Sequence, residues 1–177
     1  MRGNWPARLF GLLLVVGSVG TLLLVAMVAG ARLLPQVVTT SAVVTVAYPL
    51  DVVQRFVANP GNAAAWRKDL QSVEPRGPGA WEELGTHGER TAVSLHQPQP
   101  EPGLALRLRD DAHGWEATRE IRLEATPAGT RVNVTQTTLH LHLIPRFAAV
   151  ALRGDEDTLK RWLLDLDAGL AASTRAP

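Results

Sequence analysis

One arginine stands at a position where the surrounding pattern requires an apolar side chain. From Trp115 to Ala125 the even-numbered residues are polar, whereas the odd-numbered residues are apolar except for Arg119. Such alternation is typical of a β-strand with one buried face. A buried guanidinium is very costly unless it meets an acid, a water-filled cavity or a ligand anion. Arg119 is therefore a candidate ligand-binding residue, although a structural ion pair or a bulge that turns it outward is the commoner explanation.

Two histidines, His140 and His142, are the other side chains whose spacing suggests chemistry. They lie two residues apart and therefore share one face of an extended strand. If the alternation that starts at Val132 and Val134 continues, both face the interior, but a bulge near residues 136–138 would turn them outward. A His-X-His pair can ligate zinc, yet no third ligand can be placed beside this one. Strand polarity is the plainer interpretation, and we predict no metal site.

Aromatic side chains form core or cavity walls far more often than they take part in catalysis. The chain has no cysteine, and we find no catalytic triad, Rossmann motif or P-loop in it. The sequence therefore predicts no cofactor and no assignable catalytic residue. The candidate cavity residues are Arg119, Trp66, Trp115, Trp162, His140 and His142.

The elements that must position these side chains begin with a long hairpin from Trp115 to Leu143. Pro127 presets a turn conformation and Gly129 tolerates a positive φ, so the two alternating halves are expected to pair as antiparallel strands. A two-stranded hairpin cannot bury its apolar face alone. The rest of the chain must therefore cover that face.

The segments before the hairpin predict a mainly β domain. A β-branched strand over Val37–Ala47 precedes a helix over Leu50–Ala58, because Pro49 is tolerated at a helix start and apolar residues then recur at helical spacing. A short helical turn leads into Trp66. Turns rich in Gly and Pro separate three further predicted strands, at Ala80–Leu84, Glu89–Gln97 and Leu104–Arg109.

A long helix after Pro145 is the expected cover for the hairpin. Apolar residues recur at spacings of three and four, from Phe147 through Trp162 to Leu170, and define one face. Gly154 interrupts the pattern, and the acids that follow it suit a helix N-terminus, so the helix is expected to restart there.

Three segments resemble the START-like superfamily, which includes polyketide cyclase/dehydrase-type and lipid-transport proteins. Tyr48–Val57 together with Trp66 resembles the opening of that domain, and Gly129–Val132 resembles its Gly-Thr-Arg-Val segment. Asp157–Leu163 resembles its C-terminal helix. The resemblance covers residues 37–170, and the order of elements carries much of its weight. It implies an α+β helix-grip fold, in which a curved antiparallel sheet wraps around a long C-terminal helix and leaves a cavity between them.

The start of the chain predicts a membrane segment. Residues 9–31 contain no charged side chain and are long enough to cross a bilayer as one helix. Ala29–Ala31 also fits the cleavage site of a secretory signal peptide. The length of the apolar run favours a retained anchor over residues 1–33, followed by one domain over residues 34–177.

The placement of charge predicts an orientation and excludes one class of partner. Arg2 and Arg8 precede the apolar run and only Arg32 follows it closely, so the domain is expected outside the cytoplasm, on the far side of the membrane. Setting Arg2 and Arg8 aside leaves 16 of the 18 basic residues against 17 acidic ones, with no basic cluster on one face. Nucleic acid is therefore not an expected partner.

These features are compatible with three classes of function. The one we predict is membrane-tethered binding of a hydrophobic small molecule or lipid in the internal cavity, with transport of that ligand as an open extension. The alternative is a polyketide cyclase/dehydratase-type enzyme, which needs a positioned acid or base in the same cavity. An interaction domain with a filled core is the third. A large dry cavity would favour binding, convergent polar groups would favour catalysis, and a core without a void would favour the third class.

Overall fold

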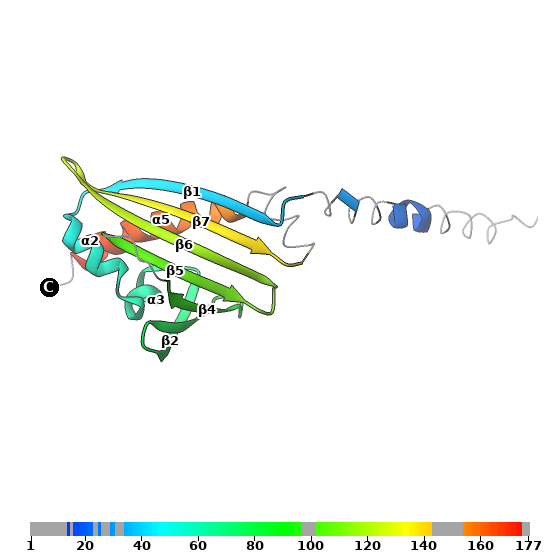
Figure 1. The fold of residues 1–177 in the computed structure, drawn as a ribbon, viewed down its shortest axis with the longest axis horizontal. Coiled ribbons are helices and arrows are strands. Elements are labelled where there is room, and N and C mark those ends of the chain that lie inside the picture. The colour runs from blue at the N-terminus through cyan, green and yellow to red at the C-terminus, as the bar shows by residue number, and fades with distance from the viewer. Residues whose placement is uncertain are drawn as a thin grey trace, which may run out of the picture.

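One antiparallel sheet of seven strands organises the structure (Figure 1). The computed structural model describes residues 14, 16–22, 25, 29–30, 34–96, 102–142 and 154–174. In chain order, the elements are β1 (Val37–Val46), α2 (Leu50–Val57), η1 (Pro60–Asn62), α3 (Ala63–Trp66), β2 (Leu70–Gly77), β3 (Ala80–Gly85), β4 (Arg90–Leu95), β5 (Gly103–Asp110), β6 (Trp115–Thr126), β7 (Gly129–His140) and α5 (Gly154–Ser173). The strand order is β1-β7-β6-β5-β4-β3-β2. Consecutive strands β1 and β2 therefore form opposite edges, and the short helices connect them.

β6 and β7 form the long hairpin that the sequence predicts. Their register runs without a shift from the pair Trp115–His140 to the pair Thr126–Gly129. Gly129 has φ of 127°, and a Cβ at this position would collide with the carbonyl oxygen of Val46 in β1. The turn therefore needs glycine both for its conformation and for the close approach of β1.

α5 covers one face of the sheet and runs behind β1 and β7 in the view of Figure 1. Gly169 of this helix lies against Trp66, and a Cβ there would clash with the indole side chain. The ring of Trp66 in turn packs edge-on against Trp162, with centroids 5.4 Å apart. The curved antiparallel sheet with its C-terminal helix confirms the predicted helix-grip arrangement. The buried residues of α5 are Leu159, Trp162, Leu163, Leu166, Gly169 and Leu170.

The face of β7 that packs under α5 changes character along its length. Val132 and Val134 are fully buried in the apolar core. Further along the same face, Gln136, Thr138 and His140 are buried polar residues. The central strands thus place a polar region beside an apolar one, on the face where the resemblance implies a cavity.

Some boundaries differ from those that the sequence predicts. The pattern does not predict β2 as a strand, because Pro75 and Gly77 are disfavoured in strands. β2 tolerates both residues because it is an edge strand that pairs only with β3 and is largely exposed. β7 ends at His140 rather than at Leu143. The predicted helical residues before Gly154, which include Phe147, lie outside the described residues.

The described residues near the N-terminus are helical and expose their apolar side chains, among them Val16 and Leu22. Over the described ranges, no helix is both long enough and apolar enough to cross a membrane. The predicted span over residues 9–31 falls partly outside these ranges, and it stays a prediction.

Candidate functional site

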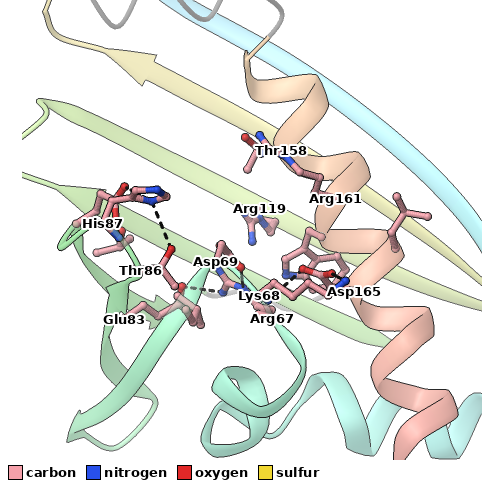
Figure 2. Close-up of a pocket in the computed structure, with 16 residues that line it drawn as sticks. Arg67, Lys68, Asp69, Glu83, Thr86, His87, Arg119, Thr158, Arg161 and Asp165 are labelled. Atoms are coloured by element: carbon pink, nitrogen blue, oxygen red, sulfur yellow. Dashed lines mark hydrogen bonds and ion pairs between the residues drawn. The ribbon is translucent and has the colours of Figure 1, made fainter.

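A pocket of about 550 Å³ lies between α5 and the half of the sheet that contains β3. Figure 2 shows how its walls are built. Thr158, Arg161 and Asp165 come from α5, and Thr86 and His87 come from the turn between β3 and β4. Arg119 of β6 lies between these two walls. The pocket therefore combines groups from four separate parts of the chain, since the segment from Arg67 to Leu70 also lines it.

Arg67, directly after α3, holds two carboxylates in this pocket. Its Nε and Nη2 donate to the Asp69 carboxylate at 3.1 and 2.7 Å, and its Nη1 donates to Glu83 Oε2 at 2.7 Å. Glu83 Oε1 also accepts a hydrogen bond of 3.1 Å from the Trp81 indole. The side chains of Arg67 and Glu83 are only 9% and 8% exposed. This cluster satisfies its own charges, which is what a buried ion pair requires.

The pairing fixes the protonation of the cluster. Burial disfavours the charge on Arg67, but Glu83 and Asp69 outweigh that effect and raise the pKa of Arg67 above its ordinary value. Burial likewise opposes the charge on Asp69, but the hydrogen bonds and positive charge of Arg67 hold the pKa of Asp69 below its ordinary value. Both groups are therefore ionised at neutral pH, and Asp69 is a weak base.

Arg119 lies in the same pocket in a different environment. It is 6% exposed, and its Nε donates to Gln136 Oε1 at 2.8 Å. Gln136 Nε2 donates in turn to Thr138 Oγ1 at 3.0 Å. The guanidinium carbon lies 5.9 Å from the ring centroid of Trp162, within cation–π range. Within the described part of the chain, Arg119 forms no ion pair, and its Nη1 and Nη2 atoms form no hydrogen bond.

The charge of Arg119 is only partly compensated. Burial, followed by the nearby positive charge of Arg67, lowers the pKa of Arg119 to about 10. Glu83 and Asp69 act in the opposite direction without cancelling that effect. Arg119 still carries its proton at neutral pH, because that pKa lies well above 7. A protonated arginine without a carboxylate partner favours the approach of an anion.

At the mouth of the pocket one basic side chain is paired and another is not. Lys68 Nζ lies 3.6 Å from Asp165 Oδ1, a contact that joins the segment of residues 67–70 to α5. Arg161, one turn before Asp165, is exposed and donates only from Nε to the carbonyl oxygen of Asp157, at 3.3 Å. His87 is exposed and lies 3.6 Å from Glu89.

A second pocket, of about 330 Å³, has mostly apolar walls. It lies against η1 and the β2–β3 hairpin, and Leu104 and Leu106 of β5 line it. Leu106 is the direct cross-strand partner of Arg119. Trp81 joins the two pockets, because its ring lines the apolar one while its indole nitrogen donates to Glu83 of the charged one.

Two of the six candidate residues, Arg119 and Trp162, line the 550 Å³ pocket. Trp66 packs against Trp162 and against Phe56, with ring centroids 5.4 and 5.6 Å apart. Its buried Nε1 has no hydrogen-bond partner among the described residues. Trp115 is half-buried at the start of β6 and packs against the core. Trp115 does not line either pocket.

The two histidines lie in different environments. The unbroken β6–β7 register keeps His140 on the buried face, where its Nε2 lies 3.2 Å from Asp155 Oδ2 at the start of α5. His142 lies beyond the end of β7 and is exposed. Neither histidine lines the charged pocket. Among the described residues, no group of three or more His, Cys, Asp or Glu side chains is arranged to hold a metal ion.

No pattern in the sequence singles out Arg67, Asp69 or Glu83. Glu83 shares a strand face with Trp81, which is the same signal that identifies Arg119, but β3 has only six residues and gives too few alternations. Arg67 and Asp69 lie between α3 and β2, where no periodicity exists to reveal their direction.

Solved structures show what this chain is similar to in fold. A START superfamily protein from Mycobacterium smegmatis matches with a TM-score of 0.63 and 16% identity, over 76% of this chain and 97% of that one. The Zhui aromatase/cyclase from Streptomyces sp. R1128 matches with a TM-score of 0.57 and 18% identity, over 78% and 94%. A norcoclaurine synthase point mutant from Thalictrum flavum, in complex with a transition-state analogue, matches with a TM-score of 0.59 and 11% identity, over 78% and 96%.

No protein-family model matches the sequence, and no curated protein matches it. The chain has a START-like fold, as the resemblance seen in the sequence implies. At identities this low the likeness concerns the fold alone. The function must therefore be inferred from the residues and geometry of the pocket.

Proposed function

We propose that this protein binds a hydrophobic small molecule or lipid in the pocket between α5 and the sheet. The observation that carries the proposal is a pocket of about 550 Å³ in which Leu70, Trp162 and Leu164 stand beside a buried, partly compensated arginine. Its volume is in the range of small-molecule sites, which commonly combine apolar walls with a few placed polar groups. The neighbouring apolar pocket beside Leu106 offers further room for a hydrocarbon body.

The pocket is large, but it is not dry. Four basic and four acidic side chains line it besides His87, and most of them are paired with one another. Paired charges act as a fixed wall rather than as proton donors and acceptors. This arrangement supports recognition of a ligand with a polar end more directly than it supports acid–base catalysis.

The second part of the proposal is that residues 9–31 tether the domain to a membrane, with the N-terminus in the cytoplasm and the domain on the far side. Support comes from the uncharged run in the sequence and from the exposed apolar side chains of described helical residues such as Val16 and Leu22. A tether would hold the pocket close to a source of lipid. Signal cleavage after Ala31 is the alternative for the same segment.

Photo-crosslinking tests the binding proposal with the full chain in lipid nanodiscs. The probe is a long-chain fatty alcohol that carries a diazirine, and mass spectrometry maps the crosslinked residues. We expect crosslinks in the peptides that contain Leu70 and Trp162, and none at Val43, which is 61% exposed on the outward face of β1. Crosslinks confined to residues 9–31 would mean that the probe only dissolves in the membrane, and the binding proposal would fail.

A fusion experiment tests the tether. An alkaline phosphatase attached after Pro177 should be active outside the cytoplasm, because Arg2 and Arg8 retain the N-terminus inside. Activity only in the cytoplasm would invert the predicted orientation. A mature N-terminus at Arg32 would show that the apolar run belongs to a cleaved signal peptide rather than to a retained anchor.

A cyclase/dehydratase-type enzyme is the second candidate, and one observation favours it. Asp69, Glu83 and Arg119 converge on one pocket with His87 at its mouth. If the protein is an enzyme, a ligand retained from expression should lose water or change its chromatographic retention time during incubation with the purified chain, because ring closure alone conserves mass. A retained ligand whose mass, retention time and quantity stay constant over several hours favours the binding function.

A further inference from the structure

The pocket has equal numbers of acidic and basic side chains, but not every basic side chain has an acidic partner. Arg67 is paired with Asp69 and Glu83, and Lys68 is paired with Asp165. In the described part of the chain, this leaves two guanidinium groups without a carboxylate partner. They are Arg119 on β6 and Arg161 on α5.

These two arginines come from different parts of the pocket, since Arg161 belongs to the α5 wall and Arg119 belongs to β6. Arg119 lies between the turn that carries Thr86 and His87 and the helix that carries Arg161 (Figure 2). Arg119 is nine-tenths buried, whereas Arg161 is exposed at the mouth. An anion that enters beside α5 would therefore pass one cation at the mouth before it meets another inside.

The orientation of Arg119 is fixed before any ligand arrives. Its Nε donates to Gln136, which is held in turn by Thr138, and the ring of Trp162 lies 5.9 Å from the guanidinium carbon. These contacts leave the Nη1 and Nη2 donors unused by the described residues. Two parallel N–H donors on a rigid guanidinium match the two oxygens of a carboxylate.

We infer that the pocket binds the carboxylate of an amphiphilic monocarboxylic acid, with Arg119 as its principal partner and Arg161 as a second cation at the mouth. This inference rests on the proposed binding function and names the class of ligand. A single negative charge fits because Asp69 and Glu83 also line the pocket and would repel a dianion such as a phosphate monoester. The apolar body of the acid packs against Leu70 and Trp162, which are buried and line the same pocket.

The experiment is a competition against the crosslinking probe, with the full chain in nanodiscs. Palmitic acid, methyl palmitate and a monoacyl phosphate of equal chain length are the competitors. The half-inhibitory concentration of each is measured for the natural chain and for Arg119→Leu. Comparing the two chains for each competitor cancels differences in how the competitors partition into the lipid.

Arg119→Leu should raise the half-inhibitory concentration of palmitic acid about ten- to hundredfold, since it removes a charged hydrogen-bond partner. The value for methyl palmitate should change less than about threefold, because the ester carries no charge. Arg161→Gln should raise the half-inhibitory concentration of palmitic acid by about threefold, as expected of an exposed cation. Arg107→Leu is the matched control, because Arg107 is exposed on the opposite face of the sheet, and it should change neither value.

Equal effects of Arg119→Leu on acid and ester would overturn the inference while the binding function stands. A lack of pocket crosslinks in the natural chain would overturn the binding function itself. If the monoacyl phosphate competes better than the acid, the preferred head group is a phosphate rather than a carboxylate, and the inference is overturned. If Arg119→Leu fails to fold, Arg119→Lys and Arg161→Gln decide the question, because both substitutions change the side-chain volume only slightly. Each of them must reduce the preference for the acid over the ester.

Discussion

Two buried arginines of the same pocket, Arg67 and Arg119, differ in what surrounds their guanidinium groups. Arg67 has two carboxylates, and its pKa is raised above its ordinary value despite burial. Arg119 has an amide oxygen and an aromatic ring, and its pKa is lowered to about 10. A buried arginine that is fully paired supports the fold. A buried arginine that is only oriented, as Arg119 is, retains the capacity to bind an anion.

The largest effect should follow from breaking the paired arginine. Arg67→Met leaves Glu83 as a buried, unpaired carboxylate, so the free energy of unfolding should fall by about 3–5 kcal/mol. Urea denaturation at pH 7 measures this loss. The double variant Arg67→Met/Glu83→Gln should recover part of it, and no recovery would mean that Arg67 stabilises the fold by packing rather than through its charge.

Removing the ring that lies near Arg119 should cost somewhat less. Trp162 is 7% exposed and packs against Trp66, so Trp162→Ala should lower the free energy of unfolding by about 3 kcal/mol. This value is at the lower end of the cost for a buried large aromatic residue, because Trp162 borders the pocket on one side. Thermal unfolding with calorimetry measures the change. An unmoved midpoint would show that α5 is not the cover of the sheet.

Arg119→Leu should have a much smaller effect on stability than Arg67→Met. The variant loses one hydrogen bond to Gln136 but relieves an incompletely compensated buried charge, so the net change should stay within about 1 kcal/mol. The same urea denaturation measures it. A loss as large as that of Arg67→Met would erase the distinction between the two arginines and make Arg119 a structural residue.

The smallest effect concerns the exposed partner of Arg67. The pKa of Asp69 is lowered in the folded protein, so its ion pair contributes stability above its ordinary pKa of about 3.9 and loses that contribution as the pH falls through the folded pKa. Asp69→Asn should therefore lower stability slightly at pH 7 and leave it unchanged at the acidic end of the folded range. An equal loss at both pH values would assign the effect to something other than the charge of Asp69.

The sequence predicts the buried position of Arg119 well, because the alternation along the strand is enough to place its side chain on the inner face. Polar and apolar residues alternate from Trp115 to Ala125 with Arg119 as the one exception, and the unshifted register of the hairpin puts Gln136 directly opposite Arg119. The same logic places His140 inside, and it fails for His142 because the strand ends before that residue. The order of elements around this hairpin is what made the START-like resemblance visible.

The rest of the site depends on contacts between distant segments. Arg67 and Glu83 meet because α3 and β3 are brought together across 16 positions of chain, and no periodicity in either segment encodes that contact. The distinction between a paired and an unpaired arginine also depends on which acids reach each one in three dimensions. The sequence therefore identifies Arg119 as a buried cation that could meet a ligand anion, but it does not decide between a ligand and a structural ion pair.

The ionisation of a bound carboxyl group shows whether Arg119 contacts it. The full chain in nanodiscs is loaded with palmitic acid labelled with ¹³C at its carboxyl carbon, and the bound resonance is followed by NMR from neutral to acidic pH. A free carboxyl group titrates near the value of a glutamate side chain, about 4.3. Contact with Arg119 predicts that the bound resonance stays at its ionised position below that pH, and that Arg119→Leu abolishes the difference. A bound carboxyl group that titrates at its free value in the natural chain, or a depressed pKa that survives Arg119→Leu, would show that Arg119 does not bind the carboxylate.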